Sequence, residues 1–172
     1  MTNNQNIQVI IVKDKVEGGQ KAFEIVKQEL EQGMKTLGLA TGSTPETLYE
    51  NIVQSDLDFS EVVGVNLDEY IGLPADHPQS YAVFMKEHLF NAKPFKETHI
   101  PDGMAEEEAE TARYNEVLKE NPIDLQILGI SLASDAIKNT SSDGYATFEY
   151  SYKVNNANRD RQLELLKNGI VL

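Results

Sequence analysis

Short apolar runs alternate with amphipathic segments over residues 1–130, and no other feature of the sequence limits the fold as strongly. An apolar, often β-branched run of this length fits a buried strand, whereas apolar residues spaced three or four apart fit a helix that covers a sheet. The predicted strands are residues 7–12, 36–41, 62–67, 98–101 and 124–130, and the predicted helices are residues 18–32, 47–54, 80–90 and 106–120. This order predicts an α/β fold with a mostly parallel sheet between helices, in which ligands bind at the carboxyl ends of the strands.

The charge balance and the absence of cysteine exclude several classes of function. The 28 acidic residues against 15 basic residues give a net charge of −13, so the surface repels nucleic acid and anionic lipid at long range. The chain has no cysteine, which excludes disulfides, thiolate nucleophiles and cysteine-bound metals. Its apolar runs are too short to span a bilayer, and its first residues lack the pattern of a signal peptide. We therefore expect a cytoplasmic protein that binds neither nucleic acid nor membrane.

The turn after the second predicted strand has the features of an anion site. Residues 39–45 read Leu-Ala-Thr-Gly-Ser-Thr-Pro, which places small and hydroxyl-bearing residues at the start of a helix. Free backbone N–H groups there, together with the hydroxyls of Thr41, Ser43 and Thr44, suit a phosphate or a carboxylate. The alternative is an ordinary helix cap, because Ser43 and Glu46 have capping-box spacing. The turn lacks the lysine of a P-loop and the glycine spacing of a dinucleotide site.

Two adjacent carboxylates, Asp68 and Glu69, follow the third predicted strand. A carboxylate at the carboxyl end of a strand and partly removed from water can act as a base, since desolvation raises its pKa toward the working range. Neighbouring residues of an extended chain point in different directions, so the two acids need not share one role. The alternative is that Asp68 caps the turn that follows it.

A glycine- and proline-containing loop at residues 71–79 leads into the helix predicted at 80–90. It could close over a substrate as a lid, or Ser80 could simply cap the helix with Tyr81 packed beneath it. The three histidines are scattered over a loop, a helix and a short strand, which does not predict a metal site.

Four segments resemble, in order, the amino-terminal part of one enzyme family. They read LGLATGSTPETLYE, VNLDEYIGLP, HPQSYAVFM and DLQILGI, at residues 37–50, 65–74, 77–85 and 124–130. Together they resemble the glucosamine-6-phosphate deaminases. The related 6-phosphogluconolactonases typically carry an arginine where this chain has Asp-Glu-Tyr at 68–70, so the resemblance favours the deaminase branch.

This resemblance implies a Rossmann-like three-layer sandwich, incomplete relative to the family, and a phosphosugar substrate. The implied enzyme belongs to amino-sugar catabolism, as a hydrolase and isomerase that converts glucosamine 6-phosphate and water to fructose 6-phosphate and ammonia. Asp68 would be the base that moves a proton between C1 and C2. The implied substrate and phosphate contacts are Thr41, Gly42, Ser43, Thr44, Glu69 and Tyr81. The resemblance implies neither a metal nor an organic cofactor.

The sequence departs from the family after residue 130. There the family has a glycine-rich loop whose acidic or amide residue, histidine and glutamate open the pyranose ring, whereas residues 131–136 read Ser-Leu-Ala-Ser-Asp-Ala and no histidine follows His99. We therefore predict a deaminase-like domain over residues 1–130 and a divergent tail over 131–172. Within the tail the pattern predicts a loop at 131–144, an edge strand at 145–154 and a helix at 159–168 ended by Gly169.

Several functional interpretations stay open at this point. One is a deaminase with weak turnover, because the loss of the ring-opening acid removes a factor of ~10²- to 10⁴-fold. Another is a non-catalytic module that binds a phosphosugar. A third is a truncated or frameshifted product whose uncovered sheet edge invites self-association. A 6-phosphogluconolactonase-like hydrolase is the remaining enzymatic alternative.

Overall fold

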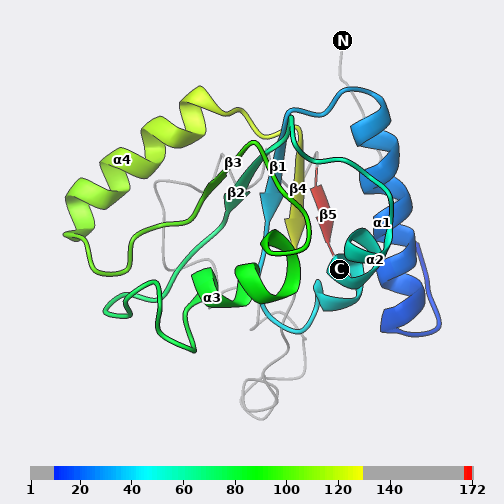
Figure 1. The fold of residues 1–172 in the computed structure, drawn as a ribbon, viewed down its shortest axis with the longest axis horizontal. Coiled ribbons are helices and arrows are strands. Elements are labelled where there is room, and N and C mark those ends of the chain that lie inside the picture. Colours follow the sequence, from blue (N-terminus) through cyan, green and yellow to red (C-terminus); the bar gives the residue numbers. More distant parts are fainter. Residues whose placement is uncertain (1–9, 130–168, 172) are drawn as a thin grey trace, which may run out of the picture.

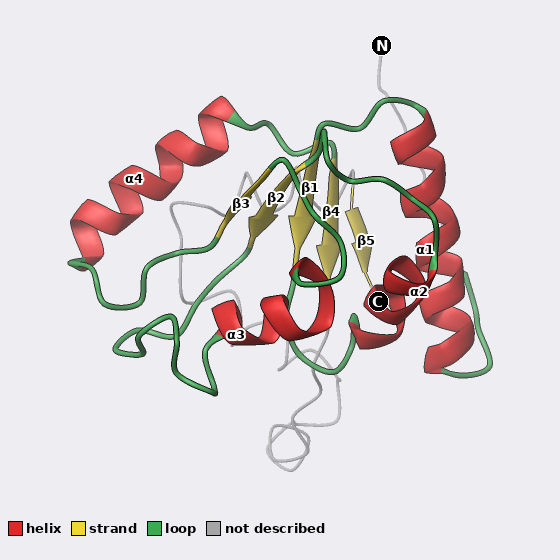
Figure 2. Cartoon of the chain, in the orientation of Figure 1, coloured by secondary structure: helices red, strands yellow, loops and turns green. Residues whose placement is uncertain are grey.

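The computed structural model of the protein describes residues 10–129 and 169–171. Its helices are α1 (Lys15–Glu31), α2 (Glu46–Gln54), α3 (Tyr81–Met85), the π-helical turn η1 (Lys86–Phe90) and α4 (Glu107–Glu120). Its strands are β1 (Thr36–Leu39), β2 (Val63–Asn66), β3 (Glu97–His99), β4 (Leu125–Leu128) and β5 (Gly169–Val171). Figure 1 follows these elements along the chain, and Figure 2 separates helices, strands and loops by colour.

The five described strands form one parallel sheet in the order β3-β2-β1-β4-β5. The chain begins at the centre of the sheet with β1, runs outward through β2 and β3, and then returns to the other side of β1 for β4 (Figure 1). The direction of winding therefore reverses between β1 and β4. In a doubly wound sheet, the carboxyl edge at such a switch point is where ligands bind. The predicted Rossmann-like α/β fold with a parallel sheet is confirmed.

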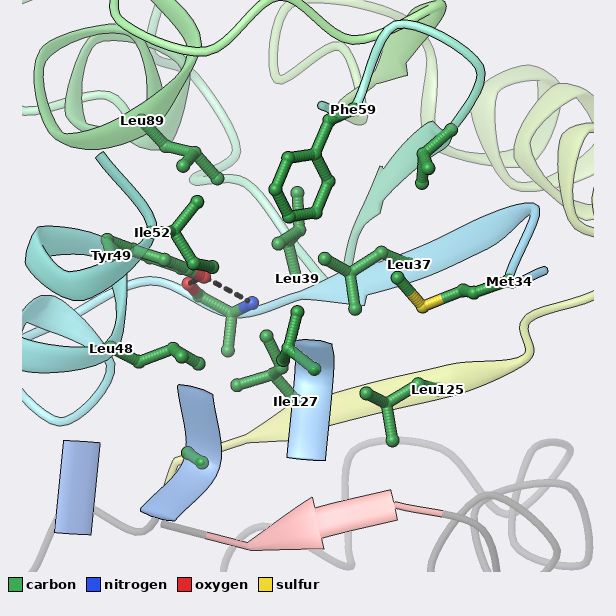
Figure 3. Packing of buried hydrophobic residues seen from close by; sticks show 14 of the residues in the cluster. Met34, Leu37, Leu39, Leu48, Tyr49, Ile52, Phe59, Leu89, Leu125 and Ile127 are labelled. Atoms are coloured by element: carbon green, nitrogen blue, oxygen red, sulfur yellow. Dashed lines mark hydrogen bonds between the residues drawn. The ribbon is translucent and has the colours of Figure 1, made fainter. Parts of the chain in front are cut away.

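One face of the sheet bears the hydrophobic core. Leu37 and Leu39 of β1 point to the same face because side chains alternate along a strand, and Leu125 and Ile127 of β4 lie beside them. Figure 3 shows these four side chains facing residues of α2 and η1, namely Leu48, Tyr49, Ile52 and Leu89. Each large aliphatic side chain buried in this way contributes roughly 1.5–3 kcal/mol to folding. The same packing holds the start of α2 close to the end of β1.

Tyr49 of α2 joins that helix to the residue that follows β1. Its ring is fully buried, and its hydroxyl donates to the C=O of Ala40 at 2.5 Å and accepts from the N–H of Ala40 at 3.2 Å (Figure 3). One side chain therefore satisfies both backbone groups of a buried residue, which would otherwise cost folding energy. Burial raises the pKa of Tyr49, so the phenol keeps its proton at neutral pH.

The helix boundaries follow the sequence patterns within a few residues. α1 begins at Lys15 instead of residue 18 because Asp14 caps it, accepting a hydrogen bond from the N–H of Glu17 at 2.9 Å. The helix predicted at 80–90 is present, and its second half winds as the π-helical turn η1. The helices predicted at 47–54 and 106–120 and the strands that correspond to β1, β2, β3 and β4 are confirmed.

The strand predicted at residues 7–12 is wrong for the part that the structure describes. Residues 10–12 form no strand, and Ile11 is 93% exposed. An apolar run becomes a strand only where a sheet offers an unpaired edge to its backbone. The outer edge of β4 is already occupied, because β5 pairs along it from Gln126 to Leu128.

β5 itself is a strand that the sequence patterns do not predict. It spans three residues, which carry too little periodicity to identify a strand, and it starts at a glycine that was expected to end a helix. The loop, strand and helix predicted at 131–144, 145–154 and 159–168 lie outside the described residues. None of the helices in the described ranges combines the length and the apolar character that crossing a bilayer requires.

Candidate functional site

The turn between β1 and α2 lies at the switch point of the sheet. Gly42 has a φ angle of 94°, a left-handed conformation that glycine adopts without strain and that lets the chain turn sharply. Gly42 and Ser43 are exposed, whereas Thr41 and Thr44 are half-buried. A Cβ atom on Gly129, directly after β4, would lie 3.3 Å from Cβ of Thr44, so the end of β4 passes close to the turn. The turn therefore occupies the position where this type of sheet binds ligands.

The capping box expected for Ser43 and Glu46 is absent. Pro45 is the N-cap of α2 and makes no side-chain hydrogen bond, and the first backbone bond of the helix runs from the N–H of Tyr49 to the C=O of Pro45 at 3.0 Å. Ser43 thus lies two residues before the N-cap, too early to cap the helix. Within residues 10–129, the hydroxyls of Ser43 and Thr44 have no hydrogen-bond partner, so they and the first N–H groups of α2 are available to an anion.

Asp68 leaves β2 at the same edge of the sheet. β1 and β2 pair in parallel register with Leu39 opposite Asn66, so the chain after each strand emerges side by side. The carboxylate of Asp68 makes no hydrogen bond to a described residue, and it therefore does not cap the turn that follows. Asp68 is exposed as a residue, but the protein atoms around its carboxyl displace part of the surrounding water, and this partial desolvation together with the charge of Glu69 raises the pKa of Asp68 above its usual range. A raised pKa makes Asp68 a stronger base than an aspartate in free solution.

Tyr81, the first residue of α3, connects Asp68 with the turn. Its hydroxyl lies close to the side chains of Tyr70 and Thr41, and the rings of Tyr70 and Tyr81 lie 4.6 Å apart between centroids. Burial, the neighbouring hydroxyl of Tyr70 and the charge of Asp68 raise the pKa of Tyr81 to about 12, so the phenol keeps its proton at neutral pH. The structure thus brings Thr41, Asp68 and Tyr81 together.

Glu69 points toward backbone groups of the protein. Its Oε1 atom accepts hydrogen bonds from the N–H groups of Tyr70 at 2.8 Å and Tyr81 at 2.9 Å, and its Oε2 atom accepts one from the N–H of Ala82 at 2.9 Å. Tyr81 and Ala82 are the first two residues of α3, whose N–H groups have no partner inside the helix. The carboxylate of Glu69 therefore ties the loop after β2 to the start of α3.

The loop at residues 71–79 is held at several points. Oγ of Ser80 accepts from the third free N–H of α3 at 3.1 Å and donates to the C=O of Ala75 at 3.1 Å. The N–H of Gly72 donates to the C=O of Gly103 at 2.7 Å. These bonds favour the interpretation of Ser80 as a helix cap over that of the loop as a free lid.

A cavity of about 390 Å³ opens between the turn and α3. Gly42 lines it together with Tyr70 and Tyr81, and Glu87 contributes a carboxylate to its wall. No lysine or arginine of the described residues lines this cavity. An anion bound there would therefore be held by N–H groups and hydroxyls, with no basic side chain from this part of the chain.

The site also includes Tyr114 of α4, which sequence analysis did not identify. Its hydroxyl donates to the C=O of Asn66 at 2.6 Å and lies 3.1 Å from the C=O of His99, at the carboxyl ends of β2 and β3. Burial raises the pKa of Tyr114, and the charges of Glu110 and Asp68 act in the same direction. The available signal is that Tyr114 is the single aromatic residue of α4.

The described residues contain no group of three His, Asp or Glu side chains that could hold a metal ion. Each histidine has its own local partner instead: His77 accepts from the N–H of Gln79, His88 stacks on Phe84, and His99 lies 3.4 Å from the carboxylate of Glu97.

Comparison with known proteins places this arrangement in context. Residues 17–131 match the model of the family described as glucosamine-6-phosphate isomerases/6-phosphogluconolactonase. A glucosamine-6-phosphate deaminase of Streptococcus sanguinis (strain SK36) is 60% identical over 125 residues, which are 72% of this chain and 53% of that protein. One of Lactobacillus helveticus (strain DPC 4571) is 55% identical over 125 residues, again 72% of this chain and 52% of the relative. The chain thus spans about half the length of these curated relatives.

Solved structures give the same result for the fold. A structure titled as a monomeric glucosamine-6-phosphate deaminase superposes with a TM-score of 0.70 at 34% identity, covering 73% of this chain and 56% of the other. A 6-phosphogluconolactonase of Thermotoga maritima superposes with a TM-score of 0.62 at 22% identity, covering 71% of this chain and 59% of the other. At that lower identity the second comparison supports the shared fold alone.

Proposed function

The chain belongs to the family of glucosamine-6-phosphate isomerases and 6-phosphogluconolactonases, and we propose that it binds glucosamine 6-phosphate and carries the base for its deamination. The observation that supports this proposal is the meeting of the turn at residues 41–44 with Asp68 at one edge of the sheet, beside the hydroxyl of Tyr81. Both curated relatives described above are named glucosamine-6-phosphate deaminases. A phosphorylated sugar is an ion that does not cross a bilayer unaided, so the proposed activity belongs in the cytoplasm.

The phosphate group would bind at the turn. Gly42 offers an exposed backbone in a sharp turn, Ser43 and Thr44 offer hydroxyls, and the start of α2 offers N–H groups and the positive end of a helix dipole. Thr41 is the fourth residue of this set, although its hydroxyl already contacts Tyr81. A phosphate dianion is the ligand that this set of donors suits best.

Asp68 would move the proton in the isomerisation. In the open-chain amino sugar, its carboxylate removes the hydrogen on C2 while the C1 oxygen takes up a proton, which gives an enolamine. The same carboxyl then returns a proton to C1, leaving an imine at C2 that water hydrolyses to fructose 6-phosphate and ammonia. The raised pKa of Asp68 suits both steps, because the group must accept a proton and then release it.

Opening of the pyranose ring is the step that this chain supports least. The family assigns it to a glycine-rich loop with a histidine and a glutamate, and this sequence has Ser-Leu-Ala-Ser-Asp-Ala at residues 131–136. This departure favours one second candidate function, a module that binds the phosphosugar without turning it over. Enolisation of a sugar that is already open distinguishes the two functions.

Hydrogen exchange at C1 of fructose 6-phosphate tests the proposal without requiring ring opening of a pyranose. In D₂O with ammonium present, open-chain fructose 6-phosphate forms the imine at C2, and the base that converts it to the enolamine replaces a C1 hydrogen by deuterium, which proton NMR detects. We expect exchange with the wild-type chain and a loss on the order of 10²- to 10⁴-fold in Asp68→Asn, with saturable binding of glucosamine 6-phosphate retained. Asp58→Asn is the matched control, because Asp58 lies before β2, at the opposite end of that strand.

Each outcome decides between the candidates. Binding without exchange supports the module, and neither binding nor exchange contradicts both. Exchange that survives in Asp68→Asn contradicts the role of Asp68. Hydrolysis of 6-phosphogluconolactone, measured with the same preparation, would support the lactonase alternative.

A further inference from the structure

Glu69 makes a set of contacts that a substrate-binding residue does not need. Both oxygens of its carboxylate are engaged by backbone N–H groups, from Tyr70 on its own loop and from Tyr81 and Ala82 at the start of α3. Glu69 and Tyr81 are 12 positions apart in the sequence, so these bonds join two separate segments. Charge-assisted bonds of this kind are short and roughly twice as strong as neutral ones.

These bonds fix the position of Tyr81, whose hydroxyl lies close to both the turn at residues 41–44 and Asp68. The N–H of Tyr81 is bonded to Glu69, while the hydroxyl of the same residue contacts Thr41 of the turn and lies within the field of Asp68. A helix that starts elsewhere would move this hydroxyl away from Thr41. The position of Tyr81 therefore depends on the carboxylate of Glu69.

We propose that Glu69 is a positioning residue, which holds Tyr81 between the phosphate turn and Asp68 without contacting the substrate. The significance of this position for catalysis rests on the proposed function, whereas the hold on Tyr81 itself does not. The inference replaces the sequence-based expectation that Glu69 contacts the substrate. The carboxylate geometry supports it, since three N–H groups already surround the two oxygens.

The charge of Glu69 has a second effect, on Asp68. Among the described residues, the titratable groups that interact electrostatically with Asp68 are Glu69 from the same loop, Tyr81 from α3 and Tyr114 from α4. Both phenols are neutral at pH 7, so Glu69 is the charged neighbour that raises the pKa of Asp68, in addition to burial. A neutral side chain at position 69 lowers the pKa of Asp68. The rate of C1 exchange then begins to fall at a lower pH, so the acid limb of the pH–rate profile moves to lower pH. A purely structural role of Glu69 would not move that limb.

Three variants test this role. Glu69→Gln keeps the size of the side chain but loses the charge and one acceptor, and Glu69→Asp keeps the charge but shortens the reach. Glu106→Gln is the matched control, because Glu106 caps α4 in the same way by accepting from the N–H groups of Glu108 at 3.1 Å and Ala109 at 2.8 Å, with no bond to the site.

Two measurements are made on each variant. Nuclear Overhauser contacts between the ring of Tyr81 and the methyl group of Thr41 report the position of Tyr81, and C1 exchange of fructose 6-phosphate as a function of pH reports the reaction. We expect Glu69→Gln to lose the contact, to slow exchange by about tenfold to a hundredfold, and to shift the acid limb downward. Glu69→Asp should lose the contact between Tyr81 and Thr41 and slow C1 exchange, but the acid limb of its pH–rate profile should stay where it is in the wild type. Glu106→Gln should behave as wild type in both measurements.

The outcomes separate this inference from the proposed function. Persistence of the contact between Tyr81 and Thr41 in both Glu69 variants overturns the inference, whatever the exchange rate. A wild-type chain without binding or exchange overturns the proposed function, and the Tyr81 contact still decides the positioning role. If Glu69→Gln does not fold, the same contact in Glu69→Asp gives the answer.

Discussion

At the scale of single residues, reactivity at Asp68 opposes stability. Its carboxyl is accessible to water but partly desolvated by neighbouring groups, and Glu69 places a like charge beside it. Both effects favour the protonated form in the folded state, as the proposed role of a base that takes up and returns a proton would require. The same effects make the ionised form less favourable in the folded chain than in the unfolded chain. Asp68 therefore destabilises the fold at neutral pH.

We predict that Asp68→Asn raises the free energy of unfolding at pH 7. Because the pKa of Asp68 is higher in the folded state, its stabilising contribution is complete below the unfolded pKa and is lost as the pH rises through the folded pKa. The gain from the substitution should be at most about 1 kcal/mol, since water screens an accessible carboxyl. The gain in stability should disappear below about pH 4, which is near the pKa of aspartate in an unfolded chain. Urea unfolding at several pH values measures it.

The control substitution, Asp58→Asn, should change the free energy of unfolding in the opposite direction. The N–H and hydroxyl of Ser60 lower the pKa of Asp58, so its contribution is present above the unfolded pKa and is lost as the pH falls through the folded value. Asp58→Asn should therefore lower stability at neutral pH. A stability loss at pH 7 in Asp68→Asn would show that its carboxylate is not strained in the folded state.

At the scale of secondary-structure elements, a close contact between α1 and α2 sets where α2 begins. A Cβ atom on Gly19 of α1 would lie 2.4 Å from Oγ1 of Thr47 and 2.8 Å from its backbone carbon. The hydroxyl of Thr47 also donates to the C=O of Lys15 at 3.0 Å. The missing side chain of Gly19 thus allows α2, and with it the turn at residues 41–44, to approach α1.

Two neighbouring glycines in α1 provide a matched test of that contact. We predict that Gly19→Ala lowers the free energy of unfolding by about 1–3 kcal/mol, because the new methyl group overlaps the backbone of α2. Gly18→Ala should instead raise it by up to about 1 kcal/mol, since its methyl group would meet only Val12 at 3.6 Å and alanine favours a helix. Chemical denaturation compares the two variants. Equal stabilities would argue against close packing of α1 on α2.

At the scale of the whole molecule, the sheet must protect its two edges. β3 is one edge strand, and its first residue, Glu97, is exposed and charged, which discourages pairing with another chain. On the other side, β5 covers the outer edge of β4. Without β5, the backbone groups of a strand with two buried apolar residues, Leu125 and Ile127, would be unpaired. β5 therefore pairs backbone groups on the outer edge of β4 that another chain could otherwise bind.

We predict that a chain ending at residue 168 associates more strongly than the full chain. Removal of β5 leaves the outer edge of β4 open along Gln126–Leu128, and open edges pair with one another. Size-exclusion chromatography with light scattering measures the mass. Removal of the same number of residues from the amino terminus is the control. Equal masses for the full chain and the variant ending at 168 would contradict this function of β5.

The parts of the molecule that could be predicted depend on local patterns. The order of helices and strands follows from apolar spacing, and the parallel sheet follows from that order. The turn at residues 41–44 and Asp68 could be identified because each directly follows a predicted strand, and the carboxyl ends of parallel strands meet at one edge. Residues 7–12 and β5 were misjudged, because whether a short run becomes a strand depends on which edge is free, and that is a property of the assembled sheet.

The amino-acid order alone therefore specified the type of fold and the two segments where chemistry is expected, because these depend on spacing along the chain, and four segments of it carried the resemblance to the family. The folded arrangement decided that Tyr81 lies between Thr41 and Asp68, that Tyr114 reaches the ends of two strands, and that Glu69 bonds to backbone N–H groups. These contacts join residues 12 to 48 positions apart. Their geometry depends on how helices pack on the sheet, and no local pattern encodes that packing.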